Sequence, residues 1–241
     1  MNAIDYLQAI RNESAALADA AAGASLETKV PTCLDWDLRK LVTHLAQVQR
    51  WIAFVVRTRA QERPDRSTFD ALAPTEPDLI AGFRKATAEL VELLSATDPT
   101  TEIWTWTPNR KARYWQRRQA HEAAIHRWDG QNAVGRPKPI ETALAVDGID
   151  ELLEMLPFVP GDRTGAGESI HLHCTDAPGE WLVRLGAKGL EVEKTHAKGD
   201  AAIRGTASDL DLFLWGRLPP TALEVFGDAA LVARFQGMTA L

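Results

Sequence analysis

The spacing of apolar residues changes once along this chain, and that change constrains the fold more than any other feature. Up to Gly135, apolar residues recur every three or four positions, as on helices that bury one side. Beyond Gly167 the spacing becomes two, which is typical of strands with one buried face. At 241 residues the chain is long enough for two such parts. We therefore expect two domains of different class, covering residues 1–137 and 138–241.

The first domain is predicted to be a bundle of four helices. The helical patterns cover residues 4–21, the stretch between Asp35 and Arg59, and residues 78–95 and 114–134. Asp35 is placed to cap the second helix, where its side chain can accept a hydrogen bond from a free backbone N–H. Residues 62–77 contain three prolines, and we expect a loop there.

The second domain is predicted to combine helices with a small sheet. Strand patterns cover 169–174, 180–185, 190–194 and 201–204, and helical patterns cover 142–156, 210–215 and 228–235. Thr206 or Ser208 is placed to cap the middle helix of this domain. The fold class that follows is α+β: a helical bundle, then a small α+β domain.

Charge and composition exclude several classes of function. The 27 basic and 33 acidic side chains give a net charge of -6, which offers no broad attraction for nucleic acid. The longest strongly apolar run, residues 51–56, is far shorter than the roughly 20 residues of a membrane span. The first residues carry no signal-peptide pattern. We expect a cytoplasmic protein, a monomer or weak dimer, that acts on a small molecule without binding nucleic acid or membrane.

The fourth helix carries a candidate metal-binding pattern. Glu122 and His126 are four residues apart, so both side chains leave the same side of the helix, and Asp129 follows three residues later. A carboxylate and an imidazole placed in this way can hold two corners of a zinc site, with Asp129 orienting a ligand. With Arg118, the same residues also match an ordinary solvent-exposed charged face with local ion pairs, which spacing alone favours.

Other histidines and the cysteines offer weaker candidates. His44 lies at the edge of the apolar stripe of the second helix, where a packed histidine and a metal ligand are both plausible interpretations. His171 and His173 lie on the same side of a predicted strand, which fits either a metal site or the solvent-exposed face of a sheet. Cys174 falls on the opposite side and is predicted to be a buried small hydrophobe. Cys33 lies in a loop and has no histidine near it in sequence.

A basic and aromatic segment precedes the candidate zinc pattern. Five basic residues lie between Arg110 and Arg118, with Tyr114 and Trp115 among them. Such a segment can bind an anionic ligand, and a loop that leads into a helix has the same composition without any function.

Two segments of the first domain resemble the mycothiol-dependent maleylpyruvate isomerase family. They are LDWDLRKLVTHL at 34–45 and RQAHEAAIHRWD at 118–129. The resemblance implies a DinB-like metal-binding four-helix bundle for the first domain. Segments 172–181, 204–210 and 214–217 resemble the sterol-carrier-protein-like C-terminal domain of the same family.

The resemblance also implies a site and a chemistry. It places a divalent metal, normally zinc, on His44, Glu122 and His126, and makes Arg217 of the second domain a catalytic residue. Mycothiol would be the thiol cosubstrate, whose metal-activated thiolate adds to the double bond of a maleyl-type substrate and leaves after rotation. His121 has no assigned role. The alternatives are a mycothiol S-transferase, a metal-dependent hydrolase and a non-catalytic ligand-binding protein.

Overall fold

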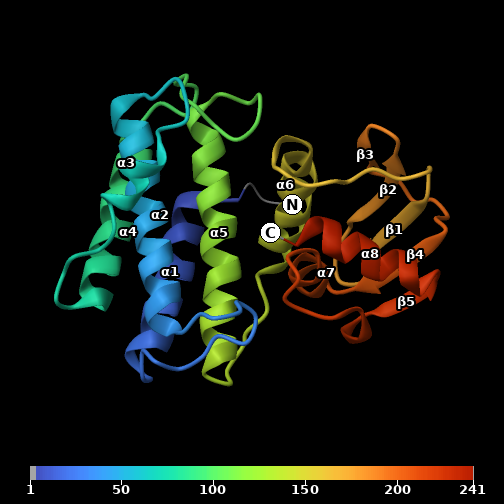
Figure 1. Cartoon of the computed structure of the whole chain (residues 1–241), viewed down its shortest axis with the longest axis horizontal. Coiled ribbons are helices and arrows are strands. Elements are labelled where there is room, and N and C mark those ends of the chain that lie inside the picture. The colour runs from blue at the N-terminus through green and yellow to red at the C-terminus, as the bar shows by residue number, and fades with distance from the viewer. Residues whose placement is uncertain (1–3, 241) are drawn as a thin grey trace. The chain divides into compact units, whose positions relative to one another are not determined.

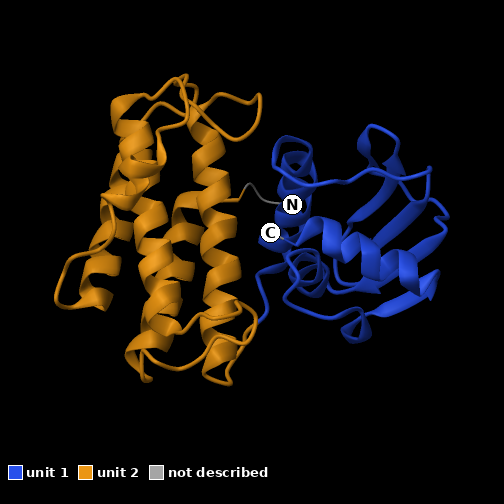
Figure 2. Ribbon diagram, viewed as in Figure 1, with its two compact units in different colours: residues 1, 139–241 blue, residues 2–138 orange. Residues whose placement is uncertain are grey.

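The computed structural model of the chain describes residues 4–240, which belong to two compact units, 2–138 and 139–241 (Figure 2). We call them the helical unit and the α+β unit, and each is considered by itself. Among the described residues, no helix is both long enough and apolar enough to cross a bilayer.

The helical unit is a four-helix bundle with one additional short helix (Figure 1). Its helices are α1 (Tyr6–Ala22), α2 (Leu38–Thr58), α3 (Arg66–Asp70), α4 (Leu79–Ala96) and α5 (Ala112–Ala133). Helix α5 packs on α1 and α2, and α4 packs on the other sides of the same two helices. The expected bundle is confirmed, and this packing places α2 beside α5.

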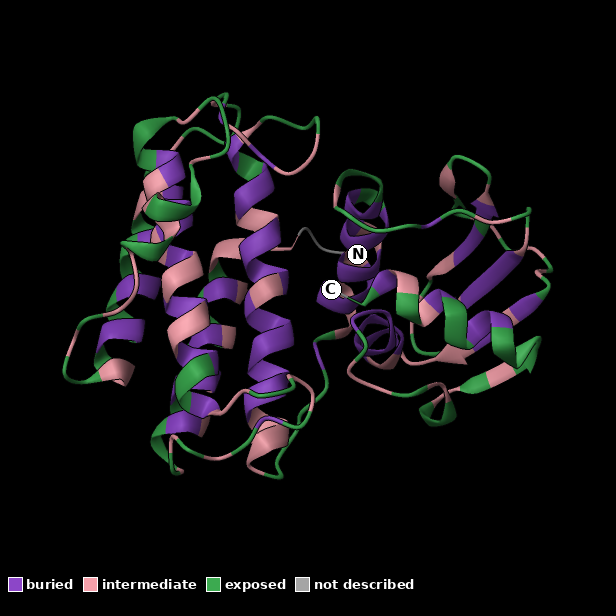
Figure 3. Cartoon of the chain, in the orientation of Figure 1, coloured by how far each residue is buried: buried purple, intermediate pink, exposed green. Residues whose placement is uncertain are grey.

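The apolar stripe of α2 forms the centre of the bundle core. Leu38, Leu41, Leu45 and Ile52 recur at three, four and seven residues and are almost fully buried. Burial of each such side chain contributes about 1.5–3 kcal/mol to folding. Figure 3 shows that α5 is buried along most of its length, so its polar residues also lie inside the protein.

The structure corrects two predictions in the helical unit. The cap of α2 is Asp37, whose side chain accepts from the backbone N–H of Lys40 at 2.9 Å, whereas Asp35 occupies the preceding turn with a positive φ of 65°. The segment expected to be a loop contains α3. Asp65 caps this helix directly after Pro64, so a local start signal outweighs the prolines around it.

The α+β unit contains a five-stranded sheet with the order β3-β2-β1-β4-β5. Its strands are β1 (Ser169–Cys174), β2 (Glu180–Gly186), β3 (Gly189–Glu193), β4 (Ala201–Gly205) and β5 (Glu224–Gly227). Strands β1 and β4 are parallel, and the other neighbouring pairs are antiparallel. The helical elements of this unit are α6 (Thr142–Met155), η1 (Leu156–Phe158), α7 (Ala207–Leu214), η2 (Pro220–Ala222) and α8 (Ala229–Thr239).

The two faces of this sheet differ in chemistry. Ile170, Leu172 and Cys174 of β1 are buried on one face, and helices α7 and α8 pack on the sheet. His171 and His173 point to the other face, as their alternation predicts. Thr206 is the cap of α7, which settles the choice left open in the sequence. Strand β5 was not expected, because an exposed edge strand of four residues has no clear alternation.

Candidate metal centre and adjoining pocket

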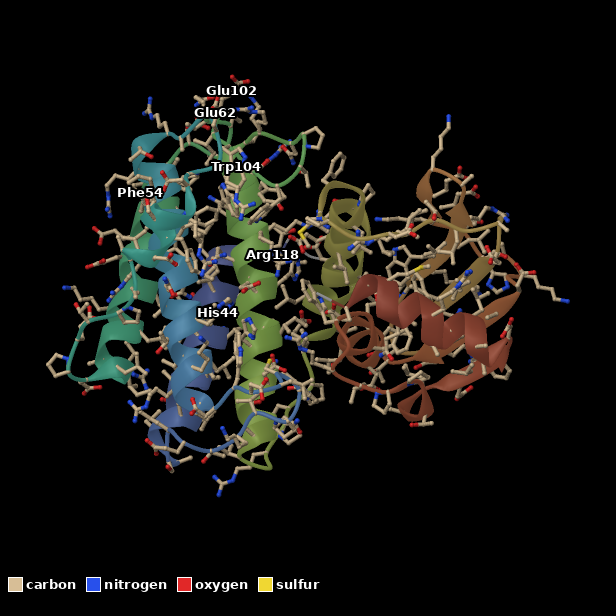
Figure 4. The ribbon with its side chains drawn as sticks, in the orientation of Figure 1. His44, Phe54, Glu62, Glu102, Trp104 and Arg118 are labelled. Carbon is tan, nitrogen blue, oxygen red and sulfur yellow. The ribbon has the colours of Figure 1, made fainter. Side chains whose placement is uncertain are left out.

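Three predicted ligands meet between α2 and α5. His44 projects from α2, while Glu122 and His126 project from α5 (Figure 4 labels His44 beside Arg118 of α5). Oε1 of Glu122 lies 3.3 Å from Nε2 of His44 and 3.3 Å from Nε2 of His126. One donor atom from each of the three residues lies within 4.8 Å of the other two. Packing of α2 on α5 therefore brings together side chains that are 78 residues apart in sequence.

The donor set fits a divalent metal ion. Zinc bonds of about 2.0–2.1 Å in a tetrahedral arrangement place neighbouring ligand atoms about 3.3 Å apart. The two spacings around Oε1 of Glu122 match that value. Two imidazoles and one carboxylate also form a set that keeps a fourth position for another molecule, as catalytic zinc sites do.

Asp129 contacts His126 on the ring nitrogen that faces away from Glu122. Its Oδ2 lies 3.0 Å from Nδ1 of His126, and its carboxylate has no exposed area. Thr32 donates its hydroxyl to Oδ1 at 2.6 Å, and Cys33 donates its thiol to Oδ2 at 3.5 Å. A carboxylate on the far nitrogen of a histidine orients the ring, so Nε2 of His126 faces Glu122. The orienting role predicted for Asp129 is consistent with this geometry.

The same contacts determine the charges of the site when no metal is bound. Burial by itself would raise the pKa of Glu122, but hydrogen bonds from His126 and His44 and the charge of Arg118 hold it well below its usual range. Burial would lower the pKa of His126, but Asp129 and Glu122 together raise it to about 9. A metal ion that binds here therefore replaces a proton on His126.

The alternative interpretation as a solvent-exposed charged face is wrong. Arg118 is 5% exposed, His126 is 7% exposed and Asp129 is fully buried. Nη2 of Arg118 donates to Oε2 of Glu122 at 3.0 Å, so this ion pair lies inside the protein. His121 is also buried, and its ring contacts the edge of Tyr6 at 6.3 Å between centroids.

A pocket of about 460 Å³ adjoins two of the three predicted ligands. His44 and Glu122 form part of its wall, together with Arg118 and Gln119 of α5. The remaining lining residues come mainly from α2, from the segment that contains α3 and from the loop before α5: Val48, Trp51, Ile52, Arg63, Pro64, Asp65, Arg66, Phe69, Trp106 and Trp115. The pocket thus combines apolar walls with cationic groups, as small-molecule sites do.

Aromatic rings give this pocket its shape. Trp51, Trp104, Trp106 and Trp115 contact one another with centroids 5.0 to 6.5 Å apart. Nε1 of Trp115 donates to the carbonyl of Trp104 at 2.8 Å, which ties the loop to α5. Sequence reasoning missed this cluster, because its rings come from three separate segments. The only signal was the basic and aromatic segment that contains Trp115.

Two arginines lie against aromatic rings that line the pocket. The guanidinium of Arg63 is 4.8 Å from the centroid of Trp106, and that of Arg66 is 5.1 Å from the centroid of Phe69. Stacking of this kind holds a cation in place on an aromatic surface. Together with Arg118, the two residues bring three cationic groups to one pocket.

The remaining predicted residues lie in the α+β unit. Arg217 is half-buried just after α7, and its Nη1 donates to the carbonyl of Trp215 at 2.7 Å; its approach to the metal stays a prediction. Cys174 is 4% exposed, and burial raises its pKa to about 12, which agrees with an unreactive buried thiol. His171 and His173 gather with two further residues, considered below.

Comparison with known proteins identifies the family. The family model of the mycothiol maleylpyruvate isomerase N-terminal domain matches residues 7–130, and that of the C-terminal domain of the same family matches residues 143–234. A crystal structure of the mycothiol-dependent maleylpyruvate isomerase shares the fold, with a TM-score of 0.63 at 14% identity over 92% of this chain and 91% of that chain.

A variant of that isomerase in which a histidine is replaced by alanine gives a TM-score of 0.64 with the same identity and coverage. Curated proteins gave no significant sequence match. The two family models together cover most of the chain in the expected order. The chain therefore belongs to the mycothiol maleylpyruvate isomerase family.

Proposed function

We propose that this chain is a metal-dependent and thiol-dependent enzyme of the maleylpyruvate isomerase type. The observation that supports this function best is that His44 and Glu122 belong both to a ligand set with the spacing of a zinc site and to the wall of a pocket. A scaffold protein would have no need for a ligand set that faces a cavity.

The chain's own residues prepare the centre for a metal and a thiol. Zinc, or another divalent metal, would lower the pKa of a thiol that reaches its open position. Asp129 holds the ring of His126 so that Nε2 faces the centre. Arg118 holds Oε2 of Glu122 at 3.0 Å, which leaves Oε1 to face the two histidines. Two of the three ligands are thus held in the orientation that binding requires, which lowers the cost of assembling the site.

The pocket favours an electrophile that carries a carboxylate. The three arginines of the pocket outnumber its two carboxylates, Asp65 and Glu122, and an arginine can bind a carboxylate through two parallel hydrogen bonds. In the proposed isomerisation, the thiolate sulfur forms a bond to one carbon of a double bond that is conjugated to a carbonyl group, and the π electron pair moves onto the carbonyl oxygen. The substrate then rotates about the resulting single bond, and the electron pair returns as the thiolate leaves. The carbon–sulfur bond breaks in this last step, so the thiol is regenerated. We further propose that Arg217 binds a substrate carboxylate.

Thiol S-transfer is a second candidate function, and the size of the pocket favours it. A pocket of about 460 Å³ with several tryptophans has room for a larger planar electrophile than a short-chain diacid. In S-transfer the carbon–sulfur bond persists in the product. The consumption of thiol therefore separates the two reactions: isomerisation needs only a catalytic amount, whereas transfer consumes one thiol per product.

The test combines metal analysis with activity. Purified protein is assayed with maleylpyruvate and with simple electrophiles, with and without mycothiol, before and after chelation. We expect His44→Ala, Glu122→Gln and His126→Ala each to lose the metal ion of this centre together with the activity. Lys40→Ala changes an exposed residue of α2 and serves as the control.

A metal content in all three ligand variants that equals that of the wild type would refute the proposed centre. Turnover that needs the metal and no thiol would indicate a metal-dependent hydrolase instead. A folded protein with neither metal nor turnover would indicate a ligand-binding protein.

A further inference from the structure

We propose that the α+β unit carries a second divalent-metal site, formed by His171, His173, Glu180 and His196. It shares no residue with the centre in the helical unit and does not depend on the function proposed above. The four residues come from three segments of the α+β unit, and one donor atom from each lies within 4.8 Å of all the others.

The register of the sheet brings the first three ligands together. His171 and His173 are two residues apart on β1, so both side chains leave the same face of the sheet. In the antiparallel pairing of β1 with β2, Glu180 lies directly opposite His173. Side chains at such opposed positions start about 4.5–5.5 Å apart at Cβ, within reach of one shared ion.

The loop between β3 and β4 brings His196 to this group. The loop passes close to β1 at Gly199, where a Cβ would lie 2.7 Å from the carbonyl oxygen of Ala201 and 3.0 Å from the backbone nitrogen of His171. The next residue, Asp200, accepts hydrogen bonds from the backbone N–H and the hydroxyl of Ser169, both at 2.8 Å. These contacts fix the end of the loop to the start of β1.

The three imidazoles point at one carboxylate. Oε2 of Glu180 lies 3.2 Å from Nε2 of His171 and 2.6 Å from Nδ1 of His196, and its Oε1 lies 3.0 Å from Nδ1 of His173. The ring centroids are 5.3 to 6.3 Å apart with interplanar angles of 58–88°. The rings are therefore not stacked face to face, and each directs a nitrogen inward.

A metal ion explains this convergence better than ion pairing alone. One carboxylate can neutralise one imidazolium, so three histidines around Glu180 are more than an ion pair needs, whereas a metal ion can accept a lone pair from every one of the three rings. Three imidazole nitrogens and one oxygen form a set that suits zinc, nickel or copper ions and does not suit magnesium or calcium.

The burial of the ligands shows how an ion would reach them. The side chain of His171 is 9% exposed, whereas that of His196 is 80% exposed. A pocket of about 330 Å³ lies beside both residues and is also lined by Phe226. An ion can therefore enter from the side of His196 and come to rest against the sheet.

Four protein ligands complete a tetrahedral set, so this site differs in role from the centre in the helical unit. A site without an open position stabilises the fold and does not hold substrate. Here the ion would join β1, β2 and the loop that carries His196. We expect its binding to raise the thermal stability of the protein.

The test counts zinc in the full-length chain after chelation and dialysis. Zinc is titrated by competition with a chromophoric chelator, using the wild type, His44→Ala/His126→Ala, and the same double variant with either His173→Ala or Glu180→Gln. We expect two zinc ions per chain in the wild type and one in the double variant. Either added substitution removes a direct ligand, so it should weaken the remaining site by more than the roughly 10- to 100-fold typical for loss of an outer-shell partner.

The controls separate this proposal from the proposed function. Glu191→Gln removes an exposed carboxylate from β3, and in the double-variant background it should leave the remaining zinc in place. Zinc should raise the melting temperature of the double variant and leave that of the triple variants unchanged. A folded double variant that binds no zinc would overturn the second site. A double variant that still binds two zinc ions, one of them lost with Glu180→Gln, would support the second site and refute the centre in the helical unit.

Discussion

Replacement of Asp129 by asparagine tests the candidate centre without removing a proposed ligand. The buried carboxylate contacts Nδ1 of His126 at 3.0 Å, and it accepts from Thr32 and Cys33 at 2.6 and 3.5 Å. Asparagine has nearly the same shape, but it loses the negative charge and gains two N–H donors. The amide nitrogen then meets either the hydroxyl of Thr32, which must turn to accept, or the donors of His126 and Cys33, and in both orientations the negative charge beside His126 is gone.

The expected loss follows from these contacts. Removal of the partner that orients a metal-bound histidine typically costs 10- to 100-fold in metal affinity, about 1.4–2.7 kcal/mol. A buried donor that loses its acceptor costs about 1–3 kcal/mol of folding stability. We therefore expect Asp129→Asn to stay folded, to melt at a lower temperature and to bind zinc 10- to 100-fold more weakly than the wild type.

The measurement is a zinc competition titration in a His173→Ala background, which removes the site proposed in the α+β unit, with circular dichroism to verify folding. Thr32→Val is the matched control, because it removes a neighbour of Asp129 and keeps the contact between carboxylate and imidazole. Its zinc affinity should stay within about threefold of the wild type, since the orienting contact remains. If Asp129→Asn is folded and binds zinc as tightly as Thr32→Val, then Asp129 only anchors the loop at Thr32, and the reasoning is refuted.

Three further predictions concern the metal-free protein, the bundle core and the buried thiol. The pKa of His126 is raised from 6.5 to about 9. Its protonation therefore contributes about 3 kcal/mol to the free energy of unfolding below pH 6.5, and this contribution is lost as the pH rises through 9. Urea unfolding of chelated protein at pH 6 and pH 9 should show this loss, and a smaller one in Asp129→Asn. Gly130→Ala should lower stability by about 1–3 kcal/mol despite the better helix propensity of alanine, because the methyl group would overlap Cδ1 of the buried Leu17; an unchanged urea midpoint would contradict this. Cys174 should resist alkylation at pH 8 in the native protein and react after unfolding, as measured by mass spectrometry, because its thiol is buried and its pKa is about 12.

Hydrophobic periodicity was sufficient for most of the architecture. The stripe of α2 from Leu38 to Val56 predicts one buried side, and that side forms the core of the bundle. Alternation in β1 predicts which residues face the helices of the α+β unit. Periodicity carried less information where an element is short. The five-residue α3 and the four-residue β5 gave too few repeats to be recognised.

The charge pattern of α5 did not predict that its polar residues are buried. Arg118, His126 and Asp129 match a solvent-exposed face, because spacing on a helix gives no information about what covers that face. In the structure they pair with one another and with Glu122 inside the protein, so each charge has a partner that offsets the cost of burial. Only the resemblance to a family indicated that His44 would join them.

Register explains why the histidine pair of β1 was underestimated. Taken as sequence, His171 and His173 have no third ligand beside them, since Glu180 comes only after a turn and His196 only after another hairpin. Antiparallel pairing of β1 with β2 overcomes the separation in sequence between His173 and Glu180, because it places the two residues opposite each other. The close approach of the loop to β1 at Gly199 brings His196 near the histidines of that strand. Metal ligands on a sheet therefore follow its register, whereas those on one helix follow a spacing that can be read directly.

The presence of two candidate sites changes what a metal measurement means for function. Zinc found in the purified protein would not by itself support an enzyme, because a four-ligand site in the α+β unit can retain zinc without any catalytic role. If catalysis takes place at the centre that faces a pocket, as we propose, activity must fall when His44 is replaced and must persist when His173 is replaced in the folded protein. If both substitutions abolish turnover while each removes only its own zinc, the second metal site contributes to the reaction and the division of roles between the two sites is wrong.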